Sequence, residues 1–127
     1  MTDYLLDDIR DHLITQSVCT SANSFKGFMP QTPDTAFAFF EYAGNPPDKV
    51  ADIESPQLQV RTRATDYNTA KGNILAVYGK LHLLWETTIN SNRYLYIYAN
   101  GSPAFLRRDA NGRCEFVQNY TVIREND

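Results

Sequence analysis

Apolar residues recur at intervals of three and four over residues 65–81, which is the periodicity of an amphipathic helix. Tyr67, Ile74, Val77 and Leu81 would lie on one face of this helix. Thr65 or Asp66 can cap its start by accepting hydrogen bonds from the first-turn N–H groups. A helix of this kind buries its apolar stripe against another element, so we expect these four side chains to be buried.

A second apolar stripe predicts a helix over residues 2–18. Leu5, Ile9 and Leu13 recur at intervals of four, and aspartates cover much of the remaining surface. Asp3 would lie near the positive end of the helix dipole. The chain therefore begins with one amphipathic helix and carries another near its middle.

The remaining regular pattern is that of β-strands, which alternate polar and apolar residues or run apolar. The expected strands are residues 37–42, 57–63, 83–89, 93–99, 105–109 and 113–123. In the second of them Leu58, Val60 and Thr62 would face the core, whereas Arg61 and Arg63 would face outward. We expect an α+β fold, with two helices packed on one face of a mostly antiparallel, twisted sheet of about four to six strands.

Three tyrosines alternate along the strand expected at 93–99. Tyr94, Tyr96 and Tyr98 would share one face of an undistorted strand. The favoured interpretation is that their rings cover a packed helix. The alternative is that they stack bases or present a protein-binding surface, although Arg93 is the only cation that adjoins them.

Two polar stretches, residues 19–34 and 43–56, predict loops longer than the usual connection. The second carries Asp48, Asp52 and Glu54, which would form a solvated surface rather than a metal site. Long loops in compact domains are often functional, so we expect both loops to contact partners.

Charge is divided unevenly within what the length predicts to be a single domain, residues 1–127. Residues 1–56 hold nine acids and three bases, and residues 57–127 hold six acids and nine bases, within a net charge of −3. This division reflects either chance or a molecule whose acidic part meets the basic part of a neighbour, as ring assembly requires. The overall acidity argues against binding to nucleic acid through phosphate neutralisation.

Basic side chains supply the remaining interface candidates. Arg107 and Arg108 are consecutive on an expected strand, so at least one of them points away from the core. Arginine is favoured at interfaces because its planar fork pairs with carboxylates. The expected subunit or partner interface therefore contains Arg61, Arg63, Arg107, Arg108, Asp48, Asp52 and Glu54.

The sequence contains none of the motifs GxSxG, HExxH or GxxxxGK[ST], and no catalytic, cofactor or metal site is expected. His12 and His82 belong to no paired motif and are expected at the surface or its rim. Cys19 and Cys114 lack metal-ligand spacing; two free thiols are favoured, and a long-range disulfide remains open. The acidic start and the lack of a long apolar run predict a protein kept in the cytoplasm, without membrane contact.

The order of elements resembles the tail terminator and head–tail joining proteins of long-tailed bacteriophages, and most closely the group called minor capsid proteins. The residues that carry the resemblance are Phe40-Glu41-Tyr42 followed by Gly44 and Pro46-Pro47, the segment 53–61 leading to Asp66-Tyr67, the helix at 70–81, and the block 116–120. The resemblance covers most of the chain.

The resemblance implies a non-enzymatic assembly protein. Such proteins form a hexameric ring that caps the tail tube and docks on the head connector or stopper, and DNA passes through the lumen. The subunit would be made in the host cytoplasm, where it can be a monomer before assembly, and end at the head–tail junction of the virion. Three alternatives remain open: a small-ligand-binding α+β domain, another component of the phage neck, and a hydrolase or transferase that depends on His12 or His82.

Overall fold

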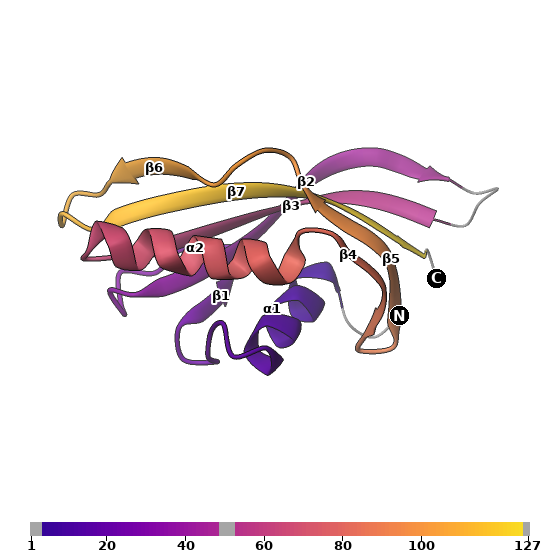
Figure 1. Cartoon of the computed structure of the whole chain (residues 1–127), viewed down its shortest axis with the longest axis horizontal. Coiled ribbons are helices and arrows are strands. Elements are labelled where there is room, and N and C mark those ends of the chain that lie inside the picture. The colour runs from indigo at the N-terminus through magenta and orange to yellow at the C-terminus, as the bar shows by residue number, and fades with distance from the viewer. Residues whose placement is uncertain (1–3, 49–52, 126–127) are drawn as a thin grey trace.

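Two helices lie against one face of a seven-stranded sheet (Figure 1). The computed structural model describes residues 4–48 and 53–125, with side chains described outside residues 43–48. In chain order the elements are α1 (Leu5–Thr15), β1 (Ser24–Lys26), β2 (Ala36–Asp48), β3 (Ile53–Ala64), α2 (Tyr67–Leu81), β4 (Leu84–Ile89), β5 (Asn92–Ala99), β6 (Ala104–Arg108) and β7 (Cys114–Glu125). The expected α+β class is confirmed.

The strand order is β1-β2-β3-β7-β5-β4, and β6 pairs with β7. Every pairing is antiparallel except that of β1 with β2. Because β6 pairs with the first part of β7 and β5 with its last part, these two strands share one side of β7. Seven strands exceed the four to six that the sequence predicts, since the short β1 lies within a stretch expected to be a loop.

The core lies between the sheet and the two apolar stripes of the helices. Leu5, Ile9 and Leu13 of α1 are buried, as are Ile74, Val77 and Leu81 of α2. Leu58, Val60 and Thr62 face them from β3, as predicted. The side chain of Asp66 caps α2 by accepting the N–H of Thr69 at 3.0 Å, which decides between the two candidate caps.

The prediction that Tyr67 is buried is wrong. Its side chain is 42% exposed because it lies in the first turn of α2, at the end of the sheet. There its ring contacts Phe105 and Phe116, with centroids 5.6 and 5.0 Å away.

The prediction of a loop at residues 43–56 is also wrong, because β2 and β3 continue as a long hairpin on both sides of residues 49–52. Register shifts interrupt the pairing between Tyr42 and Asp48. This part of β2 lies at an edge because β1 pairs only with residues 37–39, and the register shift between Asn45 and Asp48 leaves Pro46 and Pro47 outside the regular ladder with β3. The hairpin projects beyond the helices at one end of the molecule (Figure 1).

The expected tyrosine ladder is broken. A register shift against β7 lies between Tyr94 and Tyr96, so the two side chains point to opposite faces. Tyr94 is fully buried on the helix side, whereas Tyr96 and Tyr98 contact each other on the helix-free face with ring centroids 5.4 Å apart.

Cys19 and Cys114 are buried free thiols, and burial raises the pKa of Cys19. No helix within the described ranges is long and apolar enough to cross a membrane.

Candidate interaction surface

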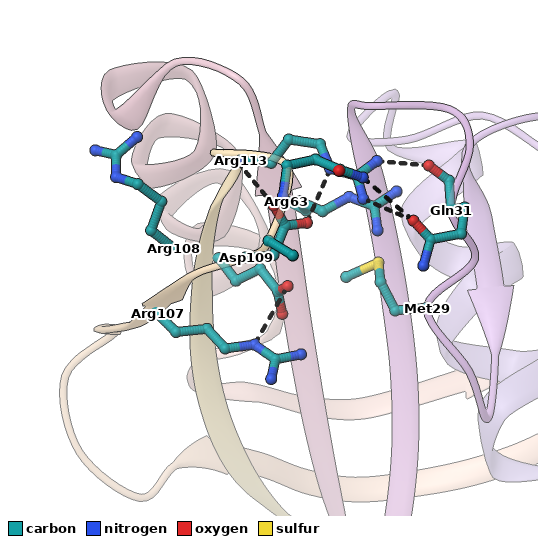
Figure 2. Close-up of a pocket in the computed structure, with 10 residues that line it drawn as sticks. Met29, Gln31, Arg63, Arg107, Arg108, Asp109 and Arg113 are labelled. Carbon is teal, nitrogen blue, oxygen red and sulfur yellow. Dashed lines mark hydrogen bonds and ion pairs between the residues drawn. The ribbon is translucent and has the colours of Figure 1, made fainter.

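A pocket of about 350 Å³ lies beside the turn between β6 and β7 (Figure 2). The β6–β7 hairpin, β3 and the segment that precedes β2 form its walls. Four arginines line it: Arg63, Arg107, Arg108 and Arg113. The β6–β7 turn lies at the opposite end of the molecule from the β2–β3 hairpin (Figure 1).

Arg113 is the fixed centre of this pocket. Its buried guanidinium donates to Asp109 Oδ2 at 2.8 Å, to Gln31 Oε1 at 3.2 Å and to Asp34 Oδ1 at 3.3 Å. Burial alone raises the pKa of Asp109, but the hydrogen bonds from Arg113 prevail and lower it below the ordinary value. These bonds fasten the segment before β2 to the β6–β7 hairpin.

Arg63 lies inside this arrangement, so the prediction that it faces solvent is wrong. It does lie on the helix-free face, but residues 31–34 cross over it and leave it 2% exposed. It donates to the carbonyl oxygens of Pro33 at 2.6 Å and Asp34 at 3.2 Å. Burial and the charge of Arg113 lower its pKa from the ordinary value, yet a guanidinium stays protonated.

Two arginines of the pocket remain available to a partner. Arg107 forms an ion pair with Glu115 at 3.5 Å, but its own side chain is 61% exposed. Arg108 is exposed, points away from the pocket and donates to the Gly112 carbonyl at 2.9 Å (Figure 2). Glu115 is buried, and its Oε1 has no hydrogen-bond partner among the described residues.

The other predicted interface residues lie elsewhere. Arg61 is half-buried over the ring of Phe40, 4.9 Å from its centroid. Glu54 is bound within the fold by Arg124. Asp48 ends β2, and its side chain lies outside the described part of the chain, as does all of Asp52. The structure therefore brings Arg63, Arg107 and Arg108 together and separates them from the rest.

The two histidines have roles within the fold. His82 Nδ1 accepts the N–H of Ala99 at 3.0 Å, and its ring stacks on Tyr78. His12 is half-buried, and burial lowers its pKa. No group of three potential metal ligands occurs within residues 4–48 and 53–125.

Sequence reasoning missed two features. One is a buried polar cluster in which Asp8 bonds to Tyr94 beside Arg124. The other is an exposed apolar patch around Trp85. The sequence pattern predicts the strand but does not show that this strand lies at the edge of the sheet, where it has a neighbour on one side only.

Comparison with known proteins gives these surfaces a context. A family model described as bacteriophage tail terminator protein matches residues 12–126. The chain belongs to this family. As a tail terminator it is a phage tail assembly protein, so its polar surfaces are first of all candidates for contacts with other proteins.

The fold of the tail terminator is shared by a chain of the solved structure "Virion of native gene transfer agent (GTA) particle". The two chains are 13% identical, the match covers 96% of this chain and 95% of the other, and the TM-score is 0.73. No curated relative matches the chain.

Proposed function

We propose that this protein ends the growth of the phage tail tube and joins the finished tail to the head. Several copies form a ring, six in the family pattern, that caps the tube on one face and meets the head connector or stopper on the other. DNA passes through the lumen. The match of the tail terminator family model to residues 12–126 carries this proposal.

The placement of the exposed arginines supports an assembly role. Arg107 and Arg108 lie beside the β6–β7 turn, and this turn is at the opposite end of the molecule from the β2–β3 hairpin (Figure 1). Two ends that face in different directions are what a subunit needs to contact different neighbours. Arg107 and Arg108, with their exposed side chains, are the residues we expect to contact a neighbouring copy or a neck protein.

The role that we propose is structural. It needs neither a catalytic group nor a cofactor or metal, and it involves no sequence-specific contact with DNA. The subunit is made in the host cytoplasm, where it exists as a monomer or a ring, and it is incorporated at the head–tail junction.

Reversal of both exposed arginines, Arg107→Glu with Arg108→Glu, tests the proposed contact. In particles assembled with this variant, electron microscopy is expected to show overlong tails, or heads and tails left unjoined. A matched control reverses two exposed lysines on α2, Lys71→Glu with Lys80→Glu, and should leave assembly intact. Filled heads joined to tails of uniform length in the arginine variant would show that these residues do not hold the joint.

A further inference from the structure

The pocket beside the β6–β7 turn holds more positive than negative charge. Its lining contains four arginines and the carboxylates of Asp109 and Glu115. A third carboxylate, that of Asp34, approaches Arg113 from outside the lining at 3.3 Å. Four guanidinium groups are therefore gathered with three carboxylates, and the excess positive charge favours an anionic group from outside the chain.

Two of the arginines are fixed in place before any partner arrives. Arg63 and Arg113 are 2% and 4% exposed, and both donate to backbone carbonyls within residues 31–34 (Figure 2). The bonds of Arg63 within the described chain go to the carbonyl oxygens of Pro33 and Asp34, which carry no full charge. Salt screens buried charges only weakly, so these two guanidinium groups attract an anion without having to move.

Arg107 is the residue of the pocket that can hold such an anion. Its side chain is 61% exposed, and its Nε lies 3.5 Å from Glu115 Oε2. Its two Nη groups have no hydrogen-bond partner among the described residues. A guanidinium carries five donors, so Arg107 can pair with the buried Glu115 through Nε and with a second carboxylate through its Nη groups.

The acids of a second copy are poor candidates for this second carboxylate. Within the side chains that the structure describes, Glu41 is the one acid that contacts no donor of its own chain. Glu86 and Glu125, for example, both pair with Arg93, and Asp66 caps α2. A contact between copies that used one of these acids would compete with an interaction already made.

We propose that the pocket binds an acidic side chain, aspartate or glutamate, of a different protein at the head–tail joint. Arg107 holds the carboxylate through its Nη groups, and the fixed charges of Arg63 and Arg113 strengthen the attraction. DNA phosphate is the less favoured anion because the chain has a net charge of −3. The inference rests on the proposed function and gives its arginine contact a partner chemistry.

Selection of second-site suppressors tests the chemistry and the source of the anion together. The phage that encodes this protein is given Arg107→Glu and selected for restored growth. We expect suppressors that replace an aspartate or glutamate of another virion protein by a basic or neutral residue. Suppressors that change acids of this chain instead, such as Glu41→Lys, would contradict the assignment to a different protein, and suppressors confined to basic or apolar residues would overturn the acidic partner.

A titration of the purified full-length chain tests the pocket without a suppressor. The probe is a capped hexaglutamate peptide at low salt, followed by the NMR signal of the Arg107 Nε–H group. Arg107→Gln is expected to weaken binding about tenfold, the loss of one charge-assisted contact. Lys71→Gln on α2 removes the same charge elsewhere, is the matched control and should change binding little.

The other results of this titration would contradict the proposal. They are the absence of binding and an equal weakening by the two substitutions. A shift of the Arg107 signal by a short DNA duplex but not by hexaglutamate would assign the pocket to phosphate instead.

Failure of this inference and failure of the proposed function give different particles. Deletion of the gene followed by tails of normal length joined to heads would refute the proposed function. Overlong or unjoined tails in the deletion, together with normal particles in Arg107→Glu, would refute the pocket contact alone.

Discussion

At the scale of single residues, Asp8 links α1 to the sheet. Its carboxylate is fully buried and accepts hydrogen bonds from Asn92 Nδ2 at 2.8 Å and from the Tyr94 hydroxyl at 2.5 Å. Arg124 Nη1 lies 4.0 Å away and supplies the opposite charge. Burial and the bond to Asp8 raise the pKa of Tyr94, so the hydroxyl remains a donor at all ordinary pH values.

Replacement of Asp8 by alanine should lower the free energy of unfolding by about 3 kcal/mol, because it leaves a buried cation and polar groups without their partner. Asp11→Ala on the same helix, where the side chain is exposed, is the control and should cost less than about 1 kcal/mol. Urea titration of both variants measures the difference. Equal losses would show that Asp8 is no more important than a surface aspartate.

At the scale of elements, His12 of α1 lies near Lys80 of α2. Its imidazole is half-buried. Burial is the main cause of its lowered pKa, and the charge of Lys80 adds to it. The folded protein therefore resists protonation of His12 more than the unfolded chain does.

This shift predicts how stability depends on pH. The unfolded chain takes up the proton first, below pH about 6.5, so stability is lost as the pH falls from there through the lower folded pKa. In His12→Gln the loss of unfolding free energy between pH 7.5 and pH 5 should be smaller than in the wild type. Urea titrations at these pH values measure both slopes. Lys80→Gln should reproduce only part of the change, because burial remains; an undiminished slope in His12→Gln would contradict the argument.

The elements show where sequence reasoning succeeds and where it stops. Periodicity predicts both helices and the strands that face them. Each of these segments buries one apolar face, and the spacing of its own apolar residues shows that face without reference to the rest of the chain. It fails at Tyr94, where one extra residue relative to β7 reverses the face of the strand. It also fails at Pro46 and Pro47, which predict a loop although they lie at a register shift in an edge strand.

At the scale of the whole molecule, the candidate site was predicted only in part. Consecutive arginines cannot both face a core, so Arg107 and Arg108 are found from sequence alone. Arg63 and Glu54 were expected outside but are bound within the fold, because their partners lie in segments distant in sequence. Local alternation carries no information about such partners.

The central claim concerns the whole molecule: this chain limits tail length and completes the joint with the head. Its most direct test is the distribution of tail lengths, measured by electron microscopy of particles formed when the gene for this protein is deleted and then restored in trans. We expect tails of variable, excessive length and separate heads in the absence of the protein, and uniform joined tails after restoration. Tails of normal, uniform length attached to heads in the deletion would contradict it.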